Sequence, residues 1–100
     1  MKIKTMEIYK DNKPISRSID LYLESDKLIL LSYDSCKGFS EERIITVEDI
    51  DSLKKAMNVE SDDDLFNKIK ADYSKADAVD QFVNFLTDHE VQYIYHRFTN

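Results

Sequence analysis

The sequence is poor in the residues on which many familiar sites depend. It has one cysteine, one glycine and one proline in 100 residues. A single glycine excludes the glycine-rich phosphate loops of nucleotide-binding proteins, because those loops need several positions without a side chain. With the single proline, it also argues against long flexible linkers. We expect a single α+β domain over residues 1–100, near the commonest domain size.

Secretion and membrane signals are also lacking. Cys36 has no partner for an intramolecular disulfide, and the first residues are too polar for a signal peptide. The longest apolar run covers residues 28–31, far short of the roughly 20 residues that span a bilayer. These absences favour a reducing compartment, so we expect a cytoplasmic protein that does not bind membranes.

No residue set of a known catalytic or metal-binding type is present. His89 and His96 lie outside any zinc-ligand spacing, and Cys36 has no recognisable base to activate it. The acidic run at 62–64 lacks the alternation and the glycine of an EF-hand loop. We therefore expect a protein that is not an enzyme and that uses no cofactor and no metal.

The spacing of apolar residues predicts the secondary structure. Alternation predicts strands over 3–9, 19–24 and 28–33, and a short fourth strand at 43–45. A polar loop is expected between the third and fourth strands, over residues 34–42. Together these strands should form an N-terminal antiparallel β-meander of three to four strands.

The second half of the chain predicts helices. Apolar residues recur at helical spacing over 47–58, 62–73 and 75–89. Thr46, Ser61 and Ser74 each stand three positions before an acid, which resembles a capping box. We expect three consecutive helices packed on the sheet, followed by a C-terminal strand over 91–96 that returns to it.

An acidic segment from Glu41 to Asp64 is the most informative feature that is present. Nine acids face three bases there, a net charge of −6 in 24 residues that equals the net charge of the whole chain. Helix starts favour acids and explain part of this charge. The remainder predicts a surface that attracts a basic protein and repels nucleic acid. The candidate partner-binding acids are Glu41, Glu42, Glu48, Asp49, Glu60, Asp62, Asp63 and Asp64.

Two tyrosines complete the candidates. Tyr93 and Tyr95 share one face of the expected last strand, opposite Ile94, His96 and Phe98. Tyrosine is enriched at binding hot spots, but it is also a good strand former, so both interpretations stay open. Both faces of this strand can be buried equally only if helices cover one and a partner covers the other.

In these acids, at Glu41–Glu42 and Ser61–Asp64, and in its α+β architecture, the chain resembles a class of bacterial inhibitors. These are the small immunity proteins of contact-dependent inhibition and related polymorphic toxin systems. The resemblance implies a tight complex with a toxin domain, often a tRNase or DNase. The leading hypothesis is a non-catalytic, antitoxin-like immunity protein that neutralises a basic toxin enzyme, a nuclease above all, without binding nucleic acid itself.

Alternatives from other classes stay open. A phage anti-CRISPR protein or nucleic-acid mimic would need carboxylates spaced like phosphates, whereas these acids cluster at expected helix starts. A regulatory or assembly subunit would need no charge-driven partner. The chain could also form a homodimer.

Overall fold

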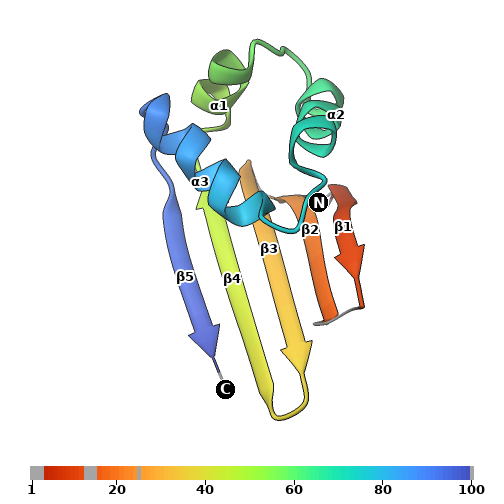
Figure 1. Ribbon diagram of the computed structural model, residues 1–100. Helices are drawn as coiled ribbons and strands as arrows, with labels where there is room; N and C mark the ends of the chain where they lie inside the picture. The colour runs from red at the N-terminus through yellow and green to blue at the C-terminus, as the bar shows by residue number, and fades with distance from the viewer. Residues whose placement is uncertain (1–3, 13–15, 25, 100) are drawn as a thin grey trace.

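Five strands and three helices make up a computed structural model that describes residues 4–12, 16–24 and 26–99. In chain order the elements are β1 (Lys4–Asp11), β2 (Ser16–Glu24), β3 (Lys27–Cys36), β4 (Phe39–Val47), α1 (Ile50–Met57), α2 (Asp62–Tyr73), α3 (Ala78–Asp88) and β5 (Ile94–Thr99). The strands form one antiparallel sheet in the order β1-β2-β3-β4-β5, and the helices lie toward one end of it (Figure 1). The expected α+β architecture is confirmed, including the strand that returns to the sheet after the helices.

The third and fourth strands are longer than the sequence predicts. The expected loop over 34–42 is wrong, because β3 and β4 stay paired as far as Cys36 and Phe39. Gly38 makes the tight connection between them with φ of +76°, a conformation that glycine adopts without strain. Polar residues are tolerated at these strand ends for two reasons. The backbone groups of β3 and β4 form hydrogen bonds with each other, and most of the helical layer covers the other end of the sheet.

One of the three predicted helix caps is confirmed. Ser61 caps α2 as predicted, because its Oγ accepts a hydrogen bond from the Asp64 backbone N–H at 3.0 Å. The expected cap at Thr46 is wrong, since β4 continues to Val47 and Asp49 is the N-cap of α1. The expected cap at Ser74 is also wrong, because Ser74 ends α2 and donates to the Lys70 carbonyl.

Residues with positive φ lie at two further boundaries, the end of α1 and the connection from α3 to β5. Asn58 ends α1 in the left-handed conformation with φ of 58°, a conformation that asparagine tolerates better than most residues. The last strand covers 94–99 and not 91–96, because Glu90 adopts a φ of 57° after α3 and the chain needs several residues to reach the sheet.

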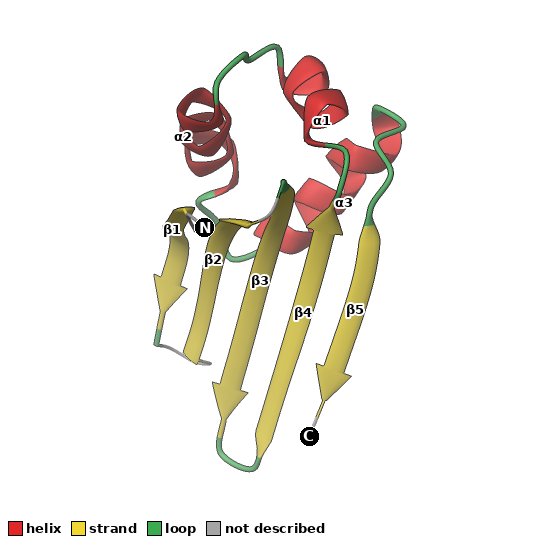
Figure 2. Ribbon diagram, turned by 180° about the vertical axis from the view of Figure 1, so that it is seen from behind, coloured by secondary structure: helices red, strands yellow, loops and turns green. Residues whose placement is uncertain are grey.

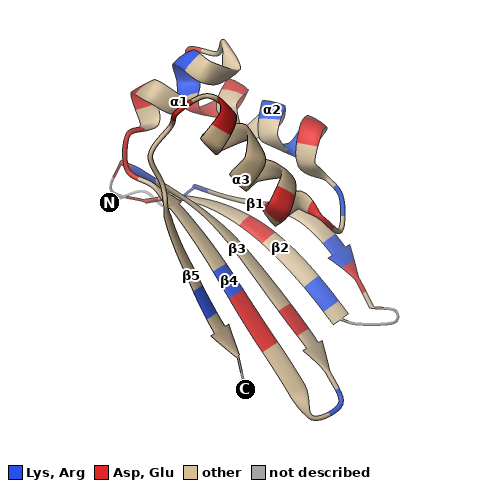
Figure 3. Ribbon diagram, turned by 60° about the vertical axis from the view of Figure 1, so that its left-hand side comes forward, with Lys and Arg blue, Asp and Glu red and all other residues tan. Residues whose placement is uncertain are grey.

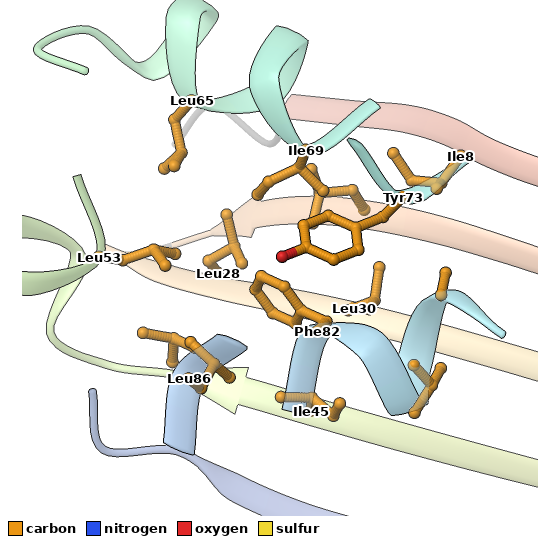
Figure 4. Packing of buried hydrophobic residues seen from close by; sticks show 14 of the residues in the cluster. Ile8, Leu28, Leu30, Ile45, Leu53, Leu65, Ile69, Tyr73, Phe82 and Leu86 are labelled. Atoms are coloured by element: carbon orange, nitrogen blue, oxygen red, sulfur yellow. The ribbon is translucent and has the colours of Figure 1, made fainter. Parts of the chain in front are cut away.

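The hydrophobic core lies between the helices and one face of the sheet. Figure 4 shows Leu28, Leu30 and Ile45 of the sheet beneath side chains from all three helices. Tyr73 and Phe82 meet edge to face, with ring centroids 5.5 Å apart. Each buried Leu, Ile or Phe stabilises the fold by about 1.5–3 kcal/mol. The contributing side chains are Ile8, Ile19, Leu21, Leu28, Leu30, Ile45, Val47, Leu53, Met57, Leu65, Phe66, Ile69, Tyr73, Ala78, Val79, Phe82, Leu86 and Val91.

Two cations fasten the helical layer to the sheet. Arg17 donates to both carboxylate oxygens of Asp34, at 2.7 and 2.8 Å, and its third nitrogen donates to the Ala76 carbonyl at 2.8 Å. The hydrogen bond to Asp34 raises the pKa of the Arg17 guanidinium. Lys70 of α2 donates to the Glu7 carbonyl at 2.7 Å, beside the irregularity in β1. The α2–α3 connection and the end of α2 are thus held against β2, β3 and β1.

Replacing Arg17 with methionine should therefore destabilise the fold. Asp34 is only 4% exposed, and its carboxylate would lose its partner, so we expect a loss of about 2–3 kcal/mol in the free energy of unfolding. The double variant Arg17→Met with Asp34→Leu should recover most of that loss, because no charge is left unpaired. Urea unfolding measures both, and a loss below about 0.5 kcal/mol for the single variant would show that the pair behaves like a surface ion pair.

Candidate partner-binding site

Five carboxylates line one hollow at the end of the sheet that carries the helices. The hollow has a volume of about 450 Å³. Its walls come from the β2–β3 connection, the junction of β4 with α1, and the first residue of α2. We call it the acidic hollow, and it is lined by Leu23, Asp26, Glu48, Asp49, Ile50, Asp51, Lys54 and Asp62. Five acids and one lysine give its walls a net charge of −4.

Two of these acids also stabilise the fold through interactions within the chain. Asp49 caps α1, where its carboxylate accepts from the Ser52 N–H at 3.1 Å and from the Ser52 hydroxyl at 2.7 Å. These hydrogen bonds lower the pKa of Asp49. Asp62 pairs with Lys54 at 2.8 Å, and this hydrogen bond raises the pKa of Lys54. One ammonium group is therefore already bound at the wall of the hollow.

The other three acids in the acidic hollow have no comparable role. Within residues 4–12, 16–24 and 26–99, no side chain forms an ion pair with Asp26, Glu48 or Asp51. All three are exposed. Their negative charge remains available to a cation from outside the molecule.

Asp26 is the acid that sequence reasoning missed. It lies 15 residues before the acidic segment begins and adopts a φ of 64° in the connection after β2. Its position in a short polar turn between two strands marks a surface residue, but no local pattern places that turn beside the start of α1. Only the antiparallel pairing of β2, β3 and β4 brings it there.

A second hollow adjoins the first. It has a volume of about 410 Å³ and is lined by Thr46, Glu48, Asp49, Val91, Gln92, Tyr93 and Ile94. We call it the tyrosine hollow. Glu48 and Asp49 belong to both hollows, so the β4–α1 junction separates an acidic depression from a more apolar one. Tyr93 is partly buried against the core, and its hydroxyl lies 3.4 Å from that of Thr87.

The two hollows gather four of the ten sequence candidates. Glu48, Asp49, Asp62 and Tyr93 line one or both of them. The remaining six lie elsewhere: Glu41, Glu42, Glu60, Asp63, Asp64 and Tyr95.

Glu41 has a structural partner that the sequence did not reveal. Its side chain is 12% exposed and accepts from Arg97 at 2.6 and 2.8 Å, while Arg43 lies 3.7 Å away. Arg43 also donates to Asp80 at the start of α3. Figure 3 shows acidic and basic positions close together on β4 and β5. We therefore assign Glu41 to an ion-pair network on the helix side of the sheet.

Three more of the candidates outside the hollows lie on α2 and on the two faces of the sheet. Asp63 pairs with Lys4, and this contact lowers the pKa of Asp63. Glu42 lies opposite Tyr33 and Phe98, on the face of the sheet away from the helices. Tyr95 lies opposite the buried Ile45, on the helix side, where it remains 41% exposed.

Other chemistries find no assembled site in the described part of the chain. His89 lies against Phe85 at the end of α3 with the two rings tilted, whereas His96 lies on β5 beside Phe98. Cys36 is an exposed free thiol at the end of β3. No group of three His, Cys, Asp or Glu side chains among the described residues could hold a metal ion. Nor does any helix in these ranges have the length and apolar character to cross a membrane.

No family model matches the chain, and neither the curated proteins nor the solved structures contain a match to it.

The two helix caps provide a test of local stability. Ser61→Ala should lower the free energy of unfolding by about 1 kcal/mol, because the Asp64 N–H loses its acceptor. Asp49→Ala should also destabilise, whereas Asp49→Asn keeps an acceptor for the Ser52 N–H and should cost less.

The Asp49 cap should also respond to pH. Since folding lowers the pKa of Asp49, its charge stabilises the fold above the unfolded pKa of about 3.9, and this contribution is lost as pH falls through the folded pKa. The difference in stability between the wild type and Asp49→Asn should therefore shrink on acidification. Urea unfolding at neutral and acidic pH measures it, and a constant difference would contradict the assignment.

Proposed function

We propose that this protein is a non-catalytic inhibitor that binds a basic enzyme, in the manner of the immunity proteins of bacterial toxin systems. The observation that carries the proposal is the convergence of five carboxylates from three separate chain segments on the acidic hollow. A toxin nuclease domain is the partner that suits this surface best, because its substrate groove must carry positive charge. The protein acts by occupying that groove.

The form of the hollow favours a basic side chain as its ligand. The hollow has a volume of about 450 Å³, enough for an arginine or lysine side chain. A concave site with mostly negative walls of low dielectric constant strengthens the local electric field. Asp26 and Glu48 line the same hollow from different chain segments, so a guanidinium bound in the hollow would have both carboxylates as acceptors. The adjoining tyrosine hollow would receive an apolar group of the partner next to the basic one.

The same geometry favours a protein partner over mimicry of nucleic acid. A nucleic-acid mimic presents its carboxylates in a row, at the spacing of phosphates. Here Asp26, Glu48 and Asp51 gather around one depression, and Glu41 and Asp63 are neutralised by neighbouring cations. A cation placed in a pocket beside an aromatic side chain is a common form of interface hot spot.

The function itself is tested by capture and inhibition. The protein should capture a basic protein from lysate of its native cell at low salt, and mass spectrometry would identify it. The purified partner should then lose its enzymatic activity in proportion to added inhibitor, with an end point at a fixed stoichiometry. A partner that keeps full activity in the complex would contradict the inhibitor function.

Neutralising the unpaired acids should weaken that complex. We expect the double variant Asp26→Asn with Glu48→Gln to lose affinity by about tenfold or more at low salt, chiefly through slower association and loss of the central ion pairs. Titration calorimetry or biosensor kinetics measures the change. Thermal unfolding should be unchanged, because neither carboxylate pairs within the described residues.

A matched control separates the hollow from net charge. Glu60→Gln with Asp64→Asn removes the same charge from exposed positions outside both hollows. Measured at the same salt concentration, it should lower affinity by about threefold or less, because these carboxylates would act on the partner only at long range. Equal losses from the two double variants would mean that overall charge, and not the acidic hollow, attracts the partner.

A further inference from the structure

One face of the sheet has no helix over it. Figure 2 views the molecule from this side, where the strands lie in front and α3 lies behind them. Paired residues of neighbouring strands point to the same side of a sheet, so the register assigns every strand residue to a face. The face away from the helices, here called the open face, carries three rows of side chains. In order from β1 to β5 they are Thr5, Tyr22, Ile29, Thr46 and Ile94; Glu7, Asp20, Leu31, Ile44 and His96; and Lys10, Ser18, Tyr33, Glu42 and Phe98.

The middle of the open face is apolar. None of the fifteen side chains in the three rows is fully buried, and the largest remain accessible: Phe98 is 57% exposed, Tyr33 44% and Ile94 43%. Ile29, Leu31 and Ile44 lie between them on the two central strands and are partly exposed. Charged residues flank this centre on β1 and β2. A continuous apolar patch with a charged margin is typical of an interaction surface.

The size of the open face fits a pairing of two sheets. With a strand spacing of about 4.8 Å and a rise of about 3.4 Å per residue, five strands of these lengths offer roughly 700 Å². A stable interface buries about 800 Å² on each partner. Two sheets of equal twist can pack face to face with their strands nearly aligned, and a second copy of this chain has that twist by construction.

The charged groups of β1 on the open face meet polar groups of a second copy in one orientation. A two-fold axis along β3 places β1 of one copy over β5 of the other and keeps each row at its own height. Glu7 then lies over His96 of the second copy, and Lys10 comes within reach of Glu42 of the second copy. The apolar residues of β3 meet their own counterparts. An axis across the strands would instead place Glu7 and Asp20 over the same acids of the second copy.

We infer that the protein forms a two-fold symmetric homodimer through the open face, with the axis along β3 and the helices on the outside. The dimer is a four-layer α/β/β/α arrangement that covers Ile29, Leu31, Tyr33 and Ile44. None of the residues in the three rows lines the acidic hollow, although Thr46 and Ile94 of the first row also line the tyrosine hollow. The dimer therefore leaves the acidic hollow itself accessible to a partner.

Sedimentation velocity over a wide range of protein concentrations tests the dimer. The wild type should sediment as a dimer, and Leu31→Lys should weaken association by about 100-fold, because it places two lysines against each other in an apolar interface. Tyr95→Lys makes the same kind of change on the opposite face of β5 and should leave the dimer intact. A wild type that stays monomeric, or a Leu31→Lys variant that still dimerises, would overturn the inference.

Charge reversal tests the orientation with variants at exposed positions, where folding is not at risk. Glu7→Lys and His96→Glu should each weaken the dimer, and the two together should restore it, because the new charges attract across the interface. Circular dichroism would confirm that every variant is folded. If the double variant dimerises no better than either single variant, the axis does not run along β3.

Discussion

Everything in this molecule depends on the fact that three amphipathic helices cover only one face of a five-stranded sheet. Their apolar stripes supply Leu53, Leu65, Ile69, Phe82 and Leu86 to a single core against β2, β3 and β4. A sheet has two faces, and the chain has no further element to place on the other one among its described residues. The same packing that stabilises the fold therefore leaves the open face without a cover.

The helices also cover only one end of the sheet, and this decides how the rest of the helix side is filled. Near the β3–β4 connection the apolar core gives way to Ser32, Asp34, Glu41 and Arg43 on the same face. Arg17, Arg97 and Asp80 complete the ion pairs of Asp34, Glu41 and Arg43, whereas the buried Ser32 hydroxyl has no hydrogen-bond partner within the described residues. Charge on the helix side of the sheet is thus mostly paired, whereas the acidic hollow, with its three unpaired acids, lies where α1 and α2 begin.

The acidic hollow arises from the meeting of two helix starts. Each helix places acids in its first turn, where they interact favourably with the positive end of the helix dipole. Asp49 and Asp51 begin α1 and Asp62 begins α2, and packing on the sheet brings both ends beside the turn that holds Asp26. Local capping chemistry and the proposed partner-binding surface therefore share residues, so a variant must separate the two roles before either is assigned.

Several features could be predicted because they depend on residues close in sequence. The alternation in β2, the helical spacing in α2 and the Ser61 cap are of this kind, and α2 has the predicted bounds. The expected loop over 34–42 failed because strand pairing extends beyond the apolar residues that reveal it. The caps at Thr46 and Ser74 failed because a capping pattern is short, and the strand or helix that precedes it can continue through it.

The amount of negative charge, the α+β class and the absence of a recognisable catalytic motif follow from composition and local periodicity, so they could be predicted from the amino-acid sequence. Which acids meet depends on the folded chain, because Asp26, Glu48 and Asp62 converge through strand register and helix packing. The fold also withdrew Glu41 from the candidate surface by pairing it with Arg97. The open face was equally a tertiary outcome, since alternation shows that a strand has two faces but not which one the helices will cover.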